Sequence, residues 1–291
     1  MKKNSEELKI RASKAGLLMT DAPGVGLTEN QAQRLEELLS RKKNPLGKPL
    51  TANMEKDLAS LIEKRDAPFE LSQTAKSYIV SLWLRLEYGY QEPVVTNELL
   101  KGNLCEQDSI ELVSDLIPAS QFRVKNREHY EDEYFTGTPD VILNKDGVIE
   151  DLKSSWTLRT FFESKPDKLY EGQAQVYMHL TGIPQYRLIY ALVDTPDEII
   201  IQEMKRYYFK FGRDEGNPEY ERICNQLEAM HKVGHIPAED RIKVFNYHYD
   251  PAYIEELIFR VKEARKFYGT LTLVDAMNRY KPEPQVSSSI V

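Results

Sequence analysis

The chain has 291 residues, of which 41% are hydrophobic, 29% charged and 10% aromatic, a length sufficient for one large domain or two modest ones. No apolar run approaches the ~20 residues that a membrane span needs, and the N-terminus is too charged to be a signal peptide. The net charge of −7 argues against a loose polycationic nucleic-acid coat. It does not exclude an enzyme that gathers its basic residues in one groove.

The small number of cysteines and the lack of a phosphate-binding loop exclude further classes of protein. Cys105 and Cys224 are too few for a disulfide framework or for the ligands of an iron–sulfur cluster. No G-x-x-x-x-G-K-[ST] loop is present, so we expect no nucleotide cofactor and no ATP motor. We therefore expect a cytoplasmic protein that does not associate with a membrane.

Apolar residues at helical spacing dominate the first part of the chain. Thr28 and Gln31 form a capping box at the start of the first predicted helix, and Leu35 and Leu38 lie on one stripe of it. The predicted helices cover residues 27–43, 50–65, 74–90 and 102–116. We expect Leu104 on the buried side of the fourth helix.

Near residue 120 the pattern changes to alternating β-branched and aromatic residues, which favours strands. The predicted strands cover residues 121–135, 140–144, 148–155 and 186–194. A helix over 168–182, ending at Gly182, separates the last two strands. Two further helices are predicted over 218–233 and 251–271.

The absence of a linker rich in Ser and Gly favours a single domain over residues 1–280. We expect a helical N-terminal part over about 1–100, an α/β core over about 100–215 and a C-terminal helical part over about 215–280. The last residues, 281–291, have the composition of a flexible tail.

The stretch "FTGTPDVILNKDGVIEDLKSS" reads as a β-hairpin. Asp146 and Gly147 are a strong turn signal between two apolar runs. A two-residue loop would pair Asp140 with Lys153, and a four-residue loop would pair Asp140 with Asp151. Both registers place Asp140, Asp151 and Lys153 on one face of the hairpin, whereas a three-residue loop would not.

Two carboxylates on one face repel each other unless one is protonated or a cation bridges them. A divalent metal ion is the cation most suited to bridge them, and oxygen ligands with room for water suit Mg²⁺ or Mn²⁺. A nearby lysine would hold an attacking water or stabilise charge on a phosphate. The alternative is a solvated strand edge with an ordinary salt bridge, because an Asp-x-Lys triplet alone is common.

"G-T-P-D", ten further residues and then "D-L-K" resemble the PD-(D/E)xK nuclease signature, with Asp140, Asp151 and Lys153 in the motif positions. Downstream, "EGQAQVY" resembles the Q-x-x-x-Y helix of the RecB and lambda-exonuclease branch, with Gln173 and Tyr177 in its two positions. The order and spacing of these motifs identify the chain as similar to that branch.

Two upstream stretches extend the resemblance. "KGNLCEQDSIEL" resembles the G-x-x-x-E helix of the branch, with Glu106 as a metal ligand and Glu111 as the alternative. "KIRASKAGLLMT" resembles the N-terminal helix of YqaJ-type phage recombination exonucleases, in which Arg11 and Ser13 would help to capture a DNA end. The resemblance implies an α/β fold with a restriction-endonuclease-like core. A central mixed β-sheet would be flanked by helices, with helical additions at both ends.

The resemblance also implies a site for one or two Mg²⁺ or Mn²⁺ ions. Its ligands would be Glu106, Asp140, Asp151 and the backbone carbonyl of Leu152. Lys153 would orient the attacking water, and Gln173 would touch that water or the DNA backbone. The residues expected to contact DNA are Arg11, Ser13, Thr138, Trp156, Arg159 and Tyr177. We expect His129 to be structural or to face DNA.

The function implied is that of a metal-dependent DNA exonuclease that digests duplex ends in phage-type recombination. Such an enzyme would be encoded by a phage or its bacterial host, form a homo-oligomer and act with a single-strand annealing protein. Two alternatives remain open. One is a catalytically inactive nuclease fold that binds DNA or assists assembly, and the other is a structure-specific endonuclease.

Overall fold

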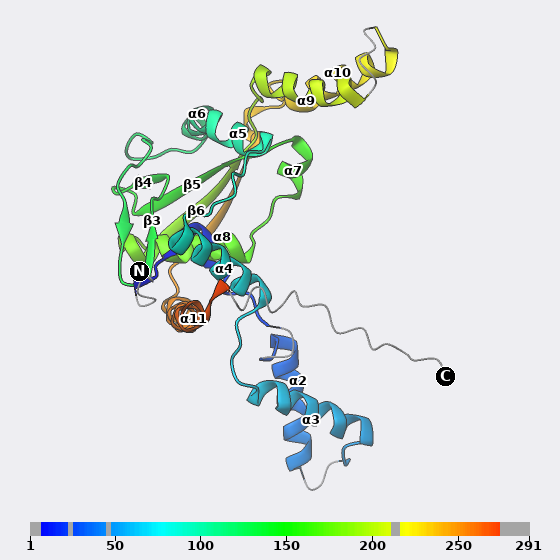
Figure 1. Cartoon of the computed structure of the whole chain (residues 1–291), viewed down its shortest axis with the longest axis vertical. Helices are drawn as coiled ribbons and strands as arrows, with labels where there is room; N and C mark the ends of the chain where they lie inside the picture. The colour runs from blue at the N-terminus through cyan, green and yellow to red at the C-terminus, as the bar shows by residue number, and fades with distance from the viewer. Residues whose placement is uncertain (1–6, 23–25, 45–47, 211–215, 274–291) are drawn as a thin grey trace. The chain divides into compact units, whose positions relative to one another are not determined.

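The computed structural model describes residues 7–22, 26–44, 48–210 and 216–273 (Figure 1). The chain divides into two compact units. Unit 1 comprises Met1–Glu7, Leu17–Tyr90 and Phe259–Val291, and unit 2 comprises Leu8–Gly16 and Gln91–Ile258. The single domain over 1–280 stays a prediction, and the tail over 281–291 lies outside the described residues. Within the described ranges, no helix is long and apolar enough to cross a membrane.

Unit 1 is helical, as the apolar spacing predicts. Its elements are α2 (Glu29–Lys43), α3 (Ala52–Asp66), α4 (Gln73–Tyr88) and the second part of α11 (Pro251–Thr270). Thr28 caps α2, and its capping box with Gln31 is confirmed. Leu38 of α2 packs in one cluster with Leu58 and Leu61 of α3, so these two helices share a small core.

The main sheet of unit 2 has the strand order β4-β5-β6-β7. Its strands are β4 (Val141–Leu143), β5 (Val148–Ser154), β6 (Gln185–Ala191) and β7 (Ile242–His248). β5 is parallel to β6, and the other two pairs are antiparallel. Ile149 and Leu188, on the two central strands, are fully buried because helices cover the sheet.

Helices lie on both faces of this sheet. α8 (Lys168–Thr181) packs on one face, and α5 (Asn97–Leu104) and α6 (Glu106–Leu116) pack on the other (Figure 1). The other helices of this unit are α7 (Leu158–Glu163), α9 (Asp197–Lys210), α10 (Pro218–His231) and a 3-10 helix over Ala238–Arg241. The predicted mixed α/β architecture is therefore confirmed.

A second, smaller sheet brings the start of the chain to the core. It has the order β1-β3-β2, formed by β1 (Ile10–Arg11), β3 (Phe135–Gly137) and β2 (Tyr130–Glu131). β1 is parallel to β3, with Arg11 opposite Thr136. α1 (Ala12–Ala15) follows β1, and the chain then crosses α8 so closely that a Cβ on Gly172 would lie 2.3 Å from the backbone nitrogen of Gly16. This crossing requires glycine.

The predicted hairpin is present, with the four-residue loop rather than the two-residue loop. Leu143 pairs with Val148 across the β4–β5 turn, and Gly147 in that turn has a φ of 63°. This is the left-handed conformation that glycine allows at no steric cost. Continuing the register places Asp140 opposite Asp151, so the two carboxylates share one face.

The prediction of one continuous helix over 102–116 is wrong. The structure has two helices there, α5 and α6, separated at Cys105. Cys105 is buried against Ala191 and Val193, whereas Leu104, predicted to be buried, is 59% exposed. The apolar spacing continues across the break, so periodicity alone does not reveal it.

The predicted strand over 121–135 is also wrong, because only its last residues join a sheet. Asn126 Oδ1 accepts a hydrogen bond from the backbone of Glu128, and Asp132 Oδ1 accepts bonds from the backbones of Tyr134 and Phe135. Such local bonds compete with a strand ladder. Strand β7 and helix α9 were not predicted.

Candidate active site

Asp140 and Asp151 form the centre of the site. Asp151 lies on β5 and is only 1% exposed. Asp140 immediately precedes β4, the strand that pairs with β5. Burial and then the charge of Asp151 raise the pKa of Asp140 to about 8. Two ionised carboxylates are therefore unfavourable here unless a cation compensates them.

Lys153 supplies one positive charge to this pair. Its Nζ lies 2.5 Å from Oδ2 of Asp151, two residues away on the same face of β5. Burial alone would lower the pKa of Lys153, but the charges of Asp151 and Asp140 raise it above its usual range. Lys153 therefore stays protonated at neutral pH and cannot itself act as a base.

Helix α8 holds the carboxylate cluster from the other side. Nε2 of Gln173 donates a 2.8 Å hydrogen bond to Oδ1 of Asp151, and the hydroxyl of Tyr177, one turn later, donates a 3.0 Å bond to the carbonyl of Thr138. A Cβ on Gly137 would lie 2.7 Å from the Tyr177 ring. The two predicted side chains thus share a helix face and contact both strands of the site.

Glu106 is the first residue of α6 and lines the same cavity as Asp140. Its carboxylate forms an ion pair with Lys125. Glu111, the alternative, is exposed and accepts a hydrogen bond from Gln107 instead. In the part of the chain that the structure describes, no three His, Cys, Asp or Glu side chains are close enough to form a metal site. The strand register places Asp140 opposite Asp151, whereas the third expected carboxylate, that of Glu106, is paired with Lys125.

A cavity of about 450 Å³ opens beside these groups. Besides Glu106, Asp140, Leu152 and Lys153, its lining includes residues of α5, α7, α8 and β6 and of the segments before β2 and after β5. Among them are Lys125, Trp156, Tyr170 and Tyr190. The lining thus combines carboxylates, two lysines and aromatic rings, a combination that suits a ligand carrying both phosphate and a flat ring.

The oxygen groups in and beside this cavity are of the chemical kind that binds a divalent cation, although the described carboxylates do not gather in a group of three. Burial and then the charge of Asp151 raise the pKa of Asp140, and a cation bound beside this carboxyl would offset both effects. Carboxylate oxygens and a backbone carbonyl are the ligands that Mg²⁺ and Mn²⁺ prefer. Leu152, which follows Asp151, also lines the cavity and would supply such a carbonyl.

The residues expected to contact DNA lie in three places. Arg11 and Ser13 are exposed around β1, beside Thr136 of β3. Trp156 lines the cavity, with its ring 4.5 Å from that of His231. Arg159 is outside the cavity lining; its side chain is 84% exposed and pairs with Glu163.

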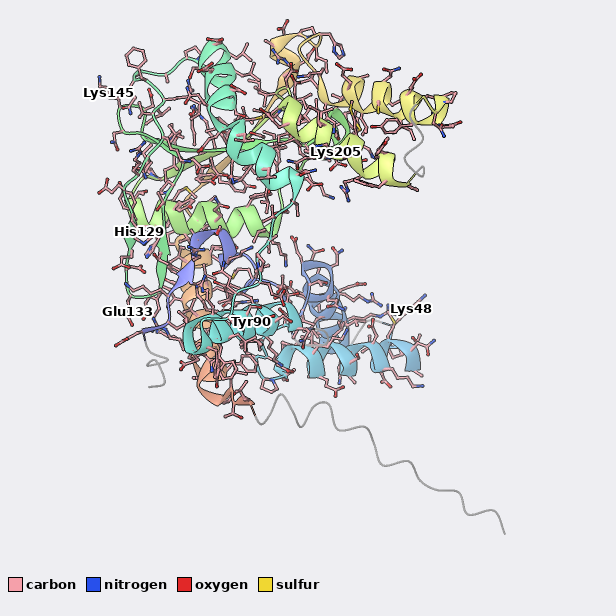
Figure 2. All side chains as sticks on the ribbon, turned by 45° about the horizontal axis from the view of Figure 1, so that its top comes forward. Lys48, Tyr90, His129, Glu133, Lys145 and Lys205 are labelled. Atoms are coloured by element: carbon pink, nitrogen blue, oxygen red, sulfur yellow. The ribbon has the colours of Figure 1, made fainter. Side chains whose placement is uncertain are left out.

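Thr138 lies next to Asp140 and is exposed. Its hydroxyl is 3.1 Å from Nδ1 of His129, and Nε2 of the same ring is 2.7 Å from the hydroxyl of Thr136 (His129 is labelled in Figure 2). His129 thus bridges two threonine hydroxyls of one segment, and whether it is structural or faces DNA stays a prediction.

Sequence reasoning missed several side chains of the cavity, among them Lys125, Tyr170 and Tyr190. Tyr170 lies one turn before Gln173 on α8, with its ring 5.6 Å from the ammonium of Lys153, and Tyr190 lies beside Lys153 in the sheet. The i, i+3 spacing from Gln173 would have indicated Tyr170. Nothing in the sequence indicates Lys125, because its partner lies on a distant helix.

No protein-family model matches the chain, and no curated protein sequence matches it. Among solved structures, it is similar to a phage-related exonuclease from Haemophilus somnus 129PT, at 20% identity and a TM-score of 0.60. That match covers 93% of this chain and 97% of the other. It is also similar to the alkaline exonuclease LHK-Exo from Laribacter hongkongensis, at 13% identity, 94% coverage of each chain and a TM-score of 0.48. The chain therefore has the fold of the phage-related exonuclease.

Proposed function

We propose that this chain is a metal-dependent DNA exonuclease that hydrolyses phosphodiester bonds from the ends of duplex DNA. The observation that carries the proposal is the buried cluster in which Asp151 contacts Lys153 and Gln173 and faces Asp140. Burying two like charges together is unfavourable for stability, so a cluster of this kind indicates chemistry. The fold shared with a phage-related exonuclease supports the proposal at the level of architecture.

The site would hold one or two Mg²⁺ or Mn²⁺ ions. Among their ligands, Asp140, the backbone carbonyl of Leu152 and Glu106 would come from the cavity lining, and Asp151 would come from the buried part of β5 beside it. A divalent ion bound there lowers the pKa of a coordinated water and stabilises negative charge on a phosphate oxygen.

Three side chains would position the reacting groups. The ammonium of Lys153 would donate hydrogen bonds to the attacking water or to the scissile phosphate, where negative charge grows during hydrolysis. Gln173 fixes the orientation of the Asp151 carboxylate through its 2.8 Å bond and touches the water or the DNA backbone. Tyr177 holds the Thr138 carbonyl, and with it the segment that carries Asp140.

DNA would enter along the segments around this cavity. The hydroxyl of Thr138 and the side chains of Arg11 and Ser13 would contact phosphates near β3. Trp156 would stack on a base at the cavity wall, and Arg159 would exchange its ion pair with Glu163 for a phosphate. These contacts would let a chain with a net charge of −7 bind DNA locally.

The proposal extends to the setting of the reaction. We infer a cytoplasmic enzyme of phage-type recombination that acts as a homo-oligomer on duplex ends and passes single strands to an annealing protein. The experiments that test these parts are sedimentation of the purified chain and capture of the annealing protein on partly digested DNA.

The nuclease assay is the main test. End-labelled linear duplex DNA, with and without a 5′-phosphate, is incubated with Mg²⁺ or Mn²⁺. We expect the wild type to shorten linear DNA from its ends. D140N and K153M should lower the rate by at least about 100-fold, because each removes a group at the reacting phosphate. K145M, which changes a lysine in the β4–β5 turn, is the matched control and should keep the wild-type rate.

The outcomes separate the alternatives. Digestion of closed circular DNA would favour the endonuclease. Binding of DNA without digestion, by the wild type and both variants alike, would favour the inactive DNA-binding protein. The ion pair between Glu106 and Lys125 favours this second candidate, because it occupies a carboxylate that the nuclease would need for a metal ion.

A further inference from the structure

Lys125 is a second lysine of the cavity, and it has no place in the motifs that led to the proposed site. It lines the cavity together with Glu106, Asp140 and Lys153. Its ammonium pairs with the carboxylate of Glu106, with the two side chains 56% and 26% exposed. The contact lies at the solvent-facing side of the site, where ions and DNA would enter.

The backbone around Lys125 is anchored on both sides. Residue 125 forms a β-bridge with Val141, and the backbone nitrogen of Asn126 donates a 2.7 Å bond to the carbonyl of Asp140. Two residues earlier, the buried guanidinium of Arg123 pairs with Glu150 at 2.7 Å. The side chain of Lys125 can therefore change partners while its backbone stays next to Asp140.

Glu106 carries the charge that Lys125 balances. Glu106 and Asp140 line the same cavity, so a divalent ion held by Asp140 would also meet the carboxylate of Glu106. A divalent ion that binds Glu106 and Asp140 would repel the ammonium of Lys125 at the same carboxylate. The ion pair and the metal-bound state are thus in competition.

We propose that Lys125 is a built-in competitor for the divalent cation, and that it exchanges Glu106 for a DNA phosphate when the cation binds. The inference rests on the proposed function, because it requires the metal site. It assigns two linked roles to one side chain. In the metal-free protein, Lys125 forms an ion pair with Glu106. Once the metal ion has replaced Lys125 at Glu106, the ammonium of Lys125 binds a DNA phosphate.

The first test is metal binding to the full-length protein, measured by calorimetry with Mn²⁺ and with Ca²⁺ in the absence of DNA. We expect K125M to bind either ion about threefold to tenfold more tightly than the wild type, because the competing ammonium is gone. K125R keeps the charge and should stay near the wild type. K145M is the matched control, since Lys145 is an exposed lysine of the same unit outside the cavity lining (Figure 2).

The second test is the salt dependence of binding to short duplex DNA in Ca²⁺. Loss of one phosphate contact in K125M should reduce the slope of log K against log salt by about one, with no change in K145M. The predicted pattern is tighter metal binding together with weaker DNA binding. A merely structural ion pair would not produce both changes.

The outcomes distinguish this inference from the proposed function. Unchanged or weaker metal affinity in K125M, with a wild type that digests DNA, overturns the role of Lys125 and leaves the nuclease intact. Tighter metal binding in K125M, with a wild type that never digests DNA, supports the competition and removes the nuclease. If neither protein binds a divalent ion at millimolar concentrations, both proposals are wrong.

Discussion

Lys101 is a buried lysine whose hydrogen bond positions the segment after β5. It is 1% exposed, and its ammonium donates a 3.1 Å bond to the carbonyl of Trp156. Burial lowers the pKa of Lys101 to about 8. Because Trp156 lines the cavity, this bond ties α5 to the cavity wall at a cost in stability.

The buried amine predicts a pH dependence of stability. The pKa of Lys101 is about 8 in the folded chain and near 10.5 when unfolded, so the unfolded chain binds more protons between these values. The free energy of unfolding of the wild type should therefore rise over this window. Relative to K101M, which does not titrate, we expect a gain of up to about 3 kcal/mol between pH 8 and pH 10.5. Urea unfolding across this range measures it, and a constant difference would contradict the burial of the amine.

Residues of the site were predictable where one element fixes their spacing. Asp151 and Lys153 alternate along one strand, and Gln173 and Tyr177 lie one turn apart on one helix, so each pair shares a face whatever surrounds it. Lys125 was not predictable. Its contact with Glu106 depends on an irregular segment whose path is set by side-chain bonds to the backbone.

At the level of elements, the N-terminal segment crosses α8 in a close contact between two stretches of backbone. A Cβ on Gly16 would lie 2.1 Å from the carbonyl oxygen of Lys168, and one on Gly172 would lie 2.3 Å from the nitrogen of Gly16. Neither neighbour can move aside, because both are backbone atoms. The crossing holds β1, and with it Arg11, beside β3.

This contact predicts a strong effect of a single methyl group. G172A should lower the free energy of unfolding by more than about 2 kcal/mol, because it separates α8 from the chain at Gly16. G102A is the control. Gly102 lies in α5 with nothing within 4 Å of an added Cβ, so alanine should be neutral or slightly stabilising there. Thermal unfolding of both variants measures the difference, and equal effects would contradict the close crossing.

Elements with strong local signals were predicted well, and those set by tertiary contacts were not. The hairpin follows from its Asp-Gly turn, and α8 ends at Gly182 with a φ of 72°, as its glycine indicates. The break at Cys105 and the short strands β1 and β2 have no such signal. They form because neighbouring segments bury them or pair with them.

At the level of the whole molecule, the chain forms two compact units, each with its own buried side chains. Leu38, Leu58 and Leu61 belong to the core of unit 1, whereas Ile149 and Leu188 belong to the main sheet of unit 2. The sequence has no linker that marks this division. Unit 2 consists of two separate stretches of the chain, Leu8–Gly16 and Gln91–Ile258, and helices of unit 1 lie between them in the sequence. Composition therefore could not reveal the two units.

Separate cores predict separate responses to mutation. L38A should destabilise unit 1 by about 2–4 kcal/mol, because it leaves a cavity among packed leucines. Hydrogen exchange should then speed up in α2 and α3 and stay unchanged in β5 and β6, while I149A should give the reverse pattern. Equal changes in both sets of amides would mean that the chain unfolds as one cooperative body.

The pairing of Ile10 with Phe135 sets an order of events during translation. The first strand leaves the ribosome long before its partner β3 exists, and the helices of unit 1 are synthesised in between. Those helices have a leucine cluster of their own and can fold while the nascent chain is still growing. The smaller sheet is completed only when β1 pairs with newly made β3, and the main sheet follows later, when β7 is synthesised.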